Sequence, residues 1–548
     1  MNGQTLEGGN SKLGKTTMWR RVLFAIACVV TLIALAYAEE NWRGRHTWQK
    51  YRRELELKGE KLTLGELLPP PVPDDKNFAL APLLKPILDY TQGTAGVVWH
   101  DTNGRARLDR FTAALPPRDG TNLTLGSLEK GTFADVAAWR EHYLRNTNSS
   151  DATASAFRSR YGLEVKGNEN SDVPAASADA PPAEVVLTAL SQLAPEFHKL
   201  REAAATRPFC RFPVHYQEEP PAGVLLPHLA RLKGMATVLQ VRATAELEAG
   251  RPSDALDDWK LALRLSDSIR DEPLIISHLV RVAILGNELQ TVREGLVRHA
   301  WIDSQLAEIE AVLRPVNLLA EYKLGMRGDR AGMVAEIEYM RRHGSWGVDV
   351  AQFFGEGATT CERVIRFGPS GWAYQNMSTF SRYIQEFTLA AVDEQARRLL
   401  PDISDNGTRA LQTQSGPYTL FVKLTQTGWC RVIQRTGRMQ TFVDATRVAC
   451  AMERYRLTNG RLPETLSTLA PQFIERIPKD VIDGQPLRWK RNADGGYVVY
   501  SIGWNKTDDG GERGWDRTDD AGVQGLLKEK AGPWVDPARG DWVWEMTK

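Results

Sequence analysis

Residues 225–269 read LLPHLARLKGMATVLQVRATAELEAGRPSDALDDWKLALRLSDSI, and this stretch decides the fold class. Apolar residues recur through it every three or four positions, as they do on one face of an α-helix. Gly250 stands where a first helix would end, and Pro252, Ser253 and Asp254 are typical of the start of a second helix. The stretch therefore predicts an antiparallel helix pair within a mainly α protein.

Helical patterning extends on both sides of this pair, from about residue 183 to 400. Gly and Pro at turn positions divide it, and further helices are predicted at 272–296, 303–324, 330–343 and 375–400. Charged residues interrupt their apolar stripes. We expect most of these charges on solvated faces, and the alternative is a polar groove.

Small and aromatic residues in the helix pair resemble the spacing of one tetratricopeptide repeat. They are Leu239, Ala243, Gly250, Ala255, Trp259 and Ala262. No second copy follows at a 34-residue period, and a lone pair cannot form a solenoid. The resemblance implies TPR-like hairpins that bind a protein partner, and an ordinary helical bundle remains the alternative.

A charge-free run near the N-terminus, Val22–Ala38 (VLFAIACVVTLIALAYA), stands apart from the rest of the chain. As a helix rising about 1.5 Å per residue it would span about 26 Å, slightly less than a hydrocarbon core of about 30 Å. Trp19 and Trp42 flank it at the positions of membrane interfaces. The run predicts a single transmembrane helix at the N-terminal end of the chain.

The orientation of this anchor is predicted from the charges next to it. Arg20 and Arg21 precede the run and Glu39 and Glu40 follow it, which favours a cytoplasmic N-terminus. The bulk of the chain is then extracytoplasmic, which means periplasmic in a double-membrane cell. Two alternatives stay open: a buried soluble helix, or a signal cleaved after Ala36-Tyr37-Ala38, which has the small-x-small form of a cleavage site, with secretion of the rest.

Composition excludes several classes of protein. The 548 residues suggest three or four folded units, and five cysteines rule out a disulfide-rich scaffold. Lys and Arg number 69 against 68 Asp and Glu, so no global field exists to bind nucleic acid. Cys210, Cys361, Cys430 and Cys450 lie outside the apolar run, and the sequence leaves open whether any of them pair.

Composition shifts along the chain predict the following organisation. In order, we expect a cytoplasmic tail (1–18), the transmembrane anchor (19–38), an anchor-proximal mixed module (39–165) with a Pro-rich spacer (69–73), a linker (166–182), a helical domain (183–435), a small α+β module (436–511), and a tail rich in Trp, Asp and Gly (512–548).

The α+β module carries the most specific pattern in the sequence. A helical stripe runs from Phe442 to Tyr455 and closes at Gly460. LRWKR, a turn at 492–496 and YVVYSIG then predict an antiparallel hairpin. The tryptophans of the tail either pack back onto this module or mark a contact surface.

About 75 residues of this module resemble the globular part of the major (G-type) pseudopilin of type II secretion. The matching positions are Tyr455, Asn459, Gly460, Pro463, Leu466, Leu469, Pro478, Lys479, Asp480, Asp483, Gly484, Tyr500, Ser501, Gly503, Gly510 and Gly511. The sequence departs from the family because Val22–Ala38 carries no acid and some 400 residues separate it from the module. The resemblance therefore extends to the module and not to assembly into a pseudopilus.

In that family the last loop of the module binds calcium, and this chain has oxygen ligands in the same place. The candidate metal ligands are Asn505, Asp508, Asp509, Asp516 and Asp519. Clustered carboxylates at glycine turns suit a hard cation that takes six to eight oxygens. The alternative is a solvated acidic loop.

No catalytic motif is present. GNSKLGKT at 9–16 matches the phosphate-binding loop in letters but lacks a preceding strand, so no nucleotide is predicted. Cys210 and His215 are a close Cys/His pair, and a buried turn is the better interpretation. We expect a non-catalytic, membrane-anchored extracytoplasmic interaction or scaffold protein. The alternatives are a component of a type II secretion-like system and an extracytoplasmic hydrolase whose site combines residues such as Glu321, Arg327, His215 and Asp329.

Overall fold

The computed structural model describes residues 11–93, 96–116, 123–148, 179–343, 368–414, 416–516 and 534–547. The chain forms two compact units, and each is described by itself. The first unit contains Met1–Leu62, Met333–Tyr383 and Arg409–Thr425, and the second contains Thr63–Gly332, Ile384–Thr408 and Gln426–Lys548. The protein is mainly helical with a few small sheets, as the sequence predicted.

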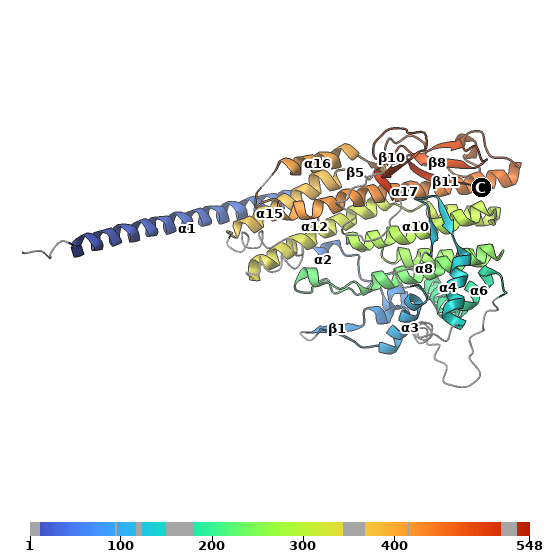
Figure 1. Ribbon diagram of the computed structural model, residues 1–548, viewed down its shortest axis with the longest axis horizontal. Coiled ribbons are helices and arrows are strands. Elements are labelled where there is room, and N and C mark those ends of the chain that lie inside the picture. Colours follow the sequence, from blue (N-terminus) through green and yellow to red (C-terminus); the bar gives the residue numbers. More distant parts are fainter. Residues whose placement is uncertain are drawn as a thin grey trace, which may run out of the picture. The chain divides into compact units, whose positions relative to one another are not determined.

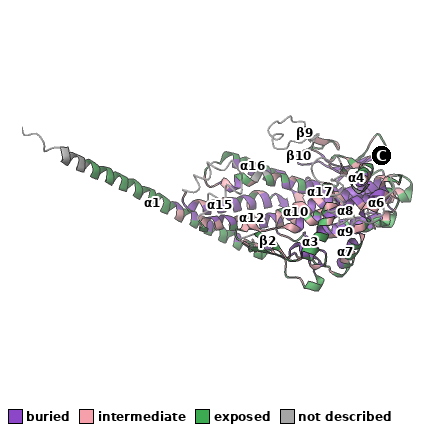
Figure 2. Ribbon diagram, turned by 60° about the horizontal axis from the view of Figure 1, so that its bottom comes forward, coloured by how far each residue is buried: buried purple, intermediate pink, exposed green. Residues whose placement is uncertain are grey.

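The first unit is built around the N-terminal helix. Its elements are α1 (Ser11–Leu57), α15 (Gly371–Tyr383), and parts of α12 (Leu318–His343), α16 (Pro401–Thr413) and α17 (Leu420–Asn459). The apolar part of α1 is exposed along its length, as the green ribbon in Figure 2 shows. It is the one helix in the described ranges that is long and apolar enough to cross a membrane.

The part of α1 that follows the charge-free run Val22–Ala38 is amphipathic. Glu40, Gly44, Trp48, Tyr51 and Leu55 are buried, and their spacing of three or four residues places them on one stripe of the helix. This stripe packs on α15. The apolar run and this amphipathic stripe belong to the same unbroken helix.

Two glycines let α1 and α15 approach closely. A Cβ on Gly44 would lie 2.4 Å from the carbonyl oxygen of Gly371, and a Cβ on Gly371 would lie 2.2 Å from that of Glu40. Asn41 Oδ1 accepts from the Gly371 N–H at 2.7 Å and from Ser370 Oγ at 3.0 Å, so it satisfies free donors at the start of α15. The part of α1 around Glu40–Gly44 is therefore held against the start of α15 by close backbone packing as well as by side-chain hydrogen bonds.

The second unit is organised around a layer of three helices. These are α8 (Pro227–Glu248), α9 (Pro252–Asp267) and α10 (Ile275–Val297), which pack on one another. Gly250 joins the first two with a φ of +75°, a conformation that glycine adopts without strain. Trp259 is fully buried and donates its indole N–H to the Glu288 carbonyl at 3.1 Å. The predicted helix pair is confirmed, while its TPR-like character stays a prediction.

One face of this layer forms a core with segments that precede it in the chain. The elements that contribute to this core are β1 (Tyr90–Gly93), β2 (Gly96–Trp99), α3 (Thr102–Ala113), β3 (Leu125–Ser127), α4 (Val136–Asn148), α6 (Pro182–Leu190) and α7 (Ala194–Thr206). Helix α2 (Leu64–Leu67) precedes them in the chain, and β4 (Thr132–Ala134) pairs with β3. Strands β1–β2 and β3–β4 form two antiparallel pairs. The sequence analysis missed α3, whose N-terminus is capped by Asp101.

The other face of the layer packs against α11 (Asp303–Leu313), α17 and the C-terminal sheet. Figure 1 shows α10, α17, β8 and β11 in this part of the molecule. Strand β8 (Tyr497–Ser501) is the middle of a three-stranded antiparallel sheet between β7 (Arg488–Arg491) and β11 (Trp542–Met546). The predicted hairpin is confirmed. The tail packs back onto it, because Trp542 pairs with Ser501 and Trp544 with Val499. Strands β9 (Arg513–Asp516) and β10 (Trp534–Gly540) form a separate antiparallel pair.

Three predicted helices are corrected by the structure, and one of them, 330–343, is the second part of α12, which runs unbroken from Leu318 to His343. The helix expected at 303–324 breaks before α12, because Pro315 cannot continue the hydrogen-bond ladder of α11. The helix expected at 375–400 ends as α15 at Tyr383. A π-helical turn, Ile384–Leu389, and the short hairpin of β5 (Val392–Asp393) and β6 (Arg398–Leu399) follow it. Leu399 is buried and its N–H donates to the Val481 carbonyl at 2.7 Å, so tertiary contacts override the helical pattern.

Candidate functional site

The acidic loop after β8 contains three of the predicted calcium ligands, Asn505, Asp508 and Asp509. Each of them already contacts another side chain of the protein. Asn505 Nδ2 donates to Asp509 Oδ2 at 2.9 Å. Asp508 Oδ2 lies 3.0 Å from Arg488 Nε on the neighbouring strand. A calcium ion would have to replace these contacts, which favours a weak site over a preformed one.

The carboxylates of the other two predicted ligands lie outside what the structure describes. Asp516 ends β9, and Asp519 lies outside the described residues. In the described parts of the chain, no three His, Cys, Asp or Glu side chains converge as a metal site would require. The calcium site therefore stays a prediction.

Sequence reasoning missed the carboxylate that holds this loop in place. Asp541 comes just before β11 and is only 1% exposed. Its two oxygens accept from the Gly511 N–H at 2.6 Å and from the Asp509 N–H at 3.3 Å. Burial, with a smaller contribution from the negative charges of Asp509 and Asp508, raises the pKa of Asp541 to about 6, although the two backbone hydrogen bonds oppose this rise. Its role is structural, because its oxygens are occupied by backbone donors.

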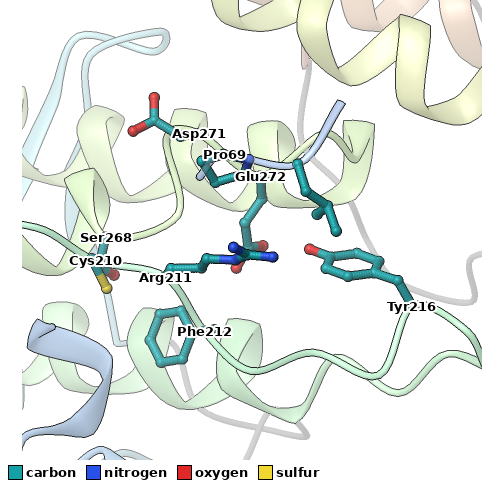
Figure 3. Close-up of a pocket in the computed structure, with 9 residues that line it drawn as sticks. Pro69, Cys210, Arg211, Phe212, Tyr216, Ser268, Asp271 and Glu272 are labelled. Carbon is teal, nitrogen blue, oxygen red and sulfur yellow. The ribbon is translucent and has the colours of Figure 1, made fainter. Parts of the chain in front are cut away.

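A small pocket lies between the segment that connects α7 to α8 and the residues that follow the end of α9. Its lining includes Cys210, Arg211, Tyr216 and Glu272, and Figure 3 shows Tyr216 pointing toward the Glu272 carboxylate beside Arg211. The cavity holds about 10 Å³, which is room for about one water molecule. It is too small for an organic substrate.

The charged and reactive groups of this pocket are already engaged. Glu272 accepts from Ser277 Oγ at 2.6 Å and lies 2.9 Å from Nε2 of the buried His228. Burial raises the pKa of the Cys210 thiol to about 12, so the thiolate that nucleophilic catalysis needs is strongly disfavoured. His215 packs on the Tyr90 ring instead of activating Cys210. The geometry agrees with the interpretation of this Cys/His pair as a structural turn.

The residues that a hydrolase site was expected to combine have separate partners. Glu321 accepts from Arg281 Nε at 2.7 Å, and Arg327 lies 3.9 Å from Glu394. Asp329 accepts from the N–H of the first residue of α10, at 3.3 Å. None of these residues lines a described cavity together with His215. The described geometry therefore offers this hydrolase hypothesis no support.

A larger cleft lies beside the β5–β6 hairpin. It holds about 570 Å³, a volume typical of small-molecule sites, and the hairpin, α17 and the 475–485 segment form its walls. Six cationic side chains line it: Arg314, Arg397, Arg398, Arg447, Arg476 and Lys479. Three carboxylates line it: Asp444, Glu475 and Asp483. We call it the basic cleft, because positive charge exceeds negative charge by three.

The carboxylates of the basic cleft are all paired with cations. Asp444 accepts from Arg447 at 2.9 Å, and Glu475 lies 3.7 Å from Arg314. Asp483 accepts from Arg488, which approaches from β7, at 2.7 Å. Asp444 also interacts electrostatically with Arg397, and the described ion pairs of these acids include none with Arg398, Arg476 or Lys479.

Glu310, which does not itself line the cleft, accepts hydrogen bonds from two of the cleft arginines. Arg314 donates to it at 2.6 Å and Arg447 at 2.9 Å. Burial alone would raise the pKa of Glu310, but the hydrogen bonds from these arginines outweigh it and leave the pKa below its usual value. Arg314 and Arg447 are therefore committed to ion pairs within the protein.

A buried aspartate builds the wall of the cleft formed by residues 475–485. Asp480 is fully buried and accepts from the Ile482 N–H at 2.8 Å, the Ile502 N–H at 3.0 Å and Ser501 Oγ at 2.7 Å. Burial raises its pKa, and these hydrogen bonds oppose that rise. Through Asp480 the loop is fixed to the end of β8, so the adjoining Lys479 has a defined position.

The sequence offered little sign of the basic cleft. Of its six cations only Lys479 stood in a matched motif, and the hairpin residues Arg397 and Arg398 lie about 80 positions earlier in a stretch predicted as helix. Comparisons of the chain with protein-family models, with curated proteins and with solved structures find no match. The assignment of function therefore rests on the geometry of this chain.

Proposed function

We propose that this protein is a membrane-tethered, extracytoplasmic interaction or scaffold protein that carries out no catalysis. Its α+β module and helical layer bind a partner, and α1 holds them at the membrane. The observation that carries the proposal is the continuity of α1. The helix passes without a break from an exposed apolar segment into a stripe, beginning at Glu40, that is buried against α15.

This continuity supports a retained anchor over a cleaved signal. Residues 36–38 lie inside the helix, where the backbone is hydrogen-bonded and not extended. The apolar side chains from Val22 to Leu35 have no partner in the described fold, and several are more than half exposed, for example Phe24 at 72% and Leu32 at 66%. In water such a surface would be costly, and a bilayer removes that cost. The charges that flank the run favour an extracytoplasmic location for the bulk of the chain.

A role within a type II secretion-like system is a second candidate, which the geometry of the module favours. The long helix α17 ends at Asn459, Gly460 follows with a φ of +71°, and a three-stranded antiparallel sheet comes next. This order is the one that the resemblance to the pseudopilin implies. Calcium at the acidic loop belongs to the same proposal and is tested below.

The membrane assignment is tested by charges placed in the exposed run. Val29→Arg with Leu32→Arg changes two side chains that are 54% and 66% exposed, so the fold should be unaffected. Arginine near a bilayer centre costs about 3 kcal/mol per residue on insertion scales. We expect the wild-type chain to stay in the membrane fraction after alkaline carbonate washing and the double variant to be released.

The matched control adds the same two charges outside the run. Gln49→Arg with Leu57→Arg, both at exposed positions of α1, should remain in the membrane.

Protease added from the extracytoplasmic side should digest the bulk of the wild-type chain in sealed cells. Intact-mass measurement of purified protein completes the test, since a chain beginning at Glu39 would contradict the retained anchor.

A further inference from the structure

We propose that the basic cleft is a binding site for an anionic ligand that carries carboxylate or phosphate groups. This inference does not depend on the membrane assignment, because it concerns the second compact unit alone and purified protein can test it. It begins with cations that the fold leaves without a carboxylate. Arg476 and Lys479 are exposed at the cleft and form no hydrogen bond or ion pair with any described residue.

Two further arginines are oriented by the backbone and not by acids. Arg397 donates to the Val316 carbonyl at 2.9 Å, and Arg398 donates to the Ile482 carbonyl at 2.8 Å. Neither forms an ion pair with a described carboxylate, and Arg398 Nε is buried without a hydrogen-bond partner. A carbonyl fixes the direction of a guanidinium group but carries no full negative charge to balance it, and Asp444, which interacts electrostatically with Arg397, already accepts from Arg447. These contacts hold the two arginines in place while their positive charge stays available.

The backbone conformation at Arg397 and Gly484 brings the β5–β6 hairpin close to the 475–485 loop. Arg397 occupies a left-handed conformation with a φ of +51° at the turn of the β5–β6 hairpin, which is uncommon for a residue other than glycine. Gly484 has a φ of +76°, and Arg398 Cδ lies 3.1 Å from the position that its Cβ would take. A side chain at residue 484 would therefore crowd the Arg398 stem. The close packing of the hairpin against the loop gives the cleft a fixed shape.

The chemistry of these groups selects the ligand. Guanidinium groups bind carboxylate and phosphate oxygens in a bidentate fashion, and an ammonium adds a point charge. The cations come from two separate segments, 395–398 and 476–479, so a ligand with more than one anionic group can use both. A duplex nucleic acid is not suggested, since the chain carries a net charge of only +1 and the cations line a cleft. A compact polyanion fits the volume and the charge.

Calorimetry on the full-length protein in detergent tests the proposal with two probes. Tripolyphosphate represents phosphate groups and citrate represents carboxylates. We expect saturable binding of at least one probe to one site, weakened several-fold when salt is raised from 50 to 300 mM. Binding of tripolyphosphate alone assigns a phosphate ligand, and binding of citrate alone assigns a carboxylate ligand. Absence of saturable heat with both probes overturns the proposal.

A charge-reversal pair locates the site. Arg476→Glu with Lys479→Glu should weaken binding at least tenfold, and both side chains are exposed and unpaired among the described residues, so folding should be retained. Arg461→Glu with Lys490→Glu makes the same charge change at exposed positions of the same module outside the cleft lining, and should leave affinity within twofold. Equal losses in both pairs would show a general charge effect and overturn the site. Arg476→Ala with Lys479→Ala, which removes charge without reversing it, should give an intermediate loss.

Discussion

The acidic loop and the basic cleft lie in the same unit and present opposite charge, but they differ in how that charge is used. The acids of the loop are neighbours in the sequence, from Asp508 to Asp516, and this made the loop conspicuous. In the fold its acids meet Arg488 and a neighbouring asparagine, and backbone donors of the loop bind Asp541. The cations of the cleft are dispersed in the sequence, yet several meet without carboxylate partners. Local charge density therefore does not measure the charge that is free to bind a ligand.

The largest expected effect comes from the buried acid that supports the cleft. Asp480→Ala removes an acceptor from two buried N–H groups and from Ser501 Oγ. We expect the free energy of unfolding to fall by about 4 kcal/mol, as for other buried hydrogen-bonded charges. Asp508→Ala, at a half-exposed ion pair in the acidic loop, should cost less than about 1 kcal/mol. Urea denaturation of both variants measures the difference, and similar losses would contradict the distinction between the two regions.

The second prediction extends the comparison to another pair assembled from distant parts of the chain. His278 on α10 is buried, and its Nε2 lies 2.9 Å from Thr436 Oγ1 on α17. Burial and, to a lesser extent, the positive charge of Arg281 lower the pKa of His278 to about 3. The unfolded chain therefore takes up a proton more readily than the folded chain below about pH 6.5.

The contribution of the neutral, buried His278 to the free energy of unfolding is fully present above pH 6.5. It is lost as the pH falls toward 3, because the unfolded chain then binds a proton that the folded chain does not. Between pH 6.5 and pH 4 the loss should be about 3 kcal/mol. His278→Gln cannot take up this proton, so the stability difference between wild type and variant should shrink by that amount over the same range. Denaturation curves at several pH values provide the test. A difference that is constant with pH would show that His278 does not titrate as burial requires.

Calcium tests whether the acidic loop can bind a ligand after all. A dissociation constant near 1 mM, at the weak end of calcium sites in proteins, would stabilise the fold by about 1 kcal/mol at 5 mM calcium. We expect a rise in melting temperature of this size that is absent in Asp509→Asn. Magnesium at the same concentration is the control for ionic strength. No calcium-specific shift would remove the site and sharpen the contrast with the cleft.

The smallest effect is expected at the rim of the cleft. Glu475 is exposed and lies 3.7 Å from Arg314. Glu475→Gln should change stability by no more than about 0.5 kcal/mol, because exposed ion pairs contribute little. It should nevertheless raise the affinity for tripolyphosphate or citrate about two- to threefold, since it removes a negative charge from the lining. A lower affinity would mean that Glu475 positions the cations and does not compete with the ligand.

Those features of the fold that are encoded by nearby residues could be predicted. The turn between α8 and α9 follows from Gly250 and Pro252, and the β7–β8 hairpin follows from the turn at 492–496. The apolar run that begins α1 was equally plain. Each of these signals is complete within about twenty residues.

Features that need distant residues could not be predicted. The contact of α1 with α15 depends on Gly44 and Gly371, and neither glycine marks a turn. The β5–β6 hairpin lies in a helical pattern and forms because Leu399 bonds to Val481. The candidate site follows the same rule: the acidic ligands were found by adjacency, while Arg397 and Arg476 come together only in the folded chain.

Hydrogen–deuterium exchange of the full-length protein, with and without saturating tripolyphosphate or citrate, compares the two regions in one measurement. If the basic cleft is the ligand site, backbone amides at 395–398 and 475–485 will become protected, and those of the acidic loop at 505–516 will not change. Protection confined to the acidic loop, or no change at the cleft in the presence of bound ligand, would contradict the account.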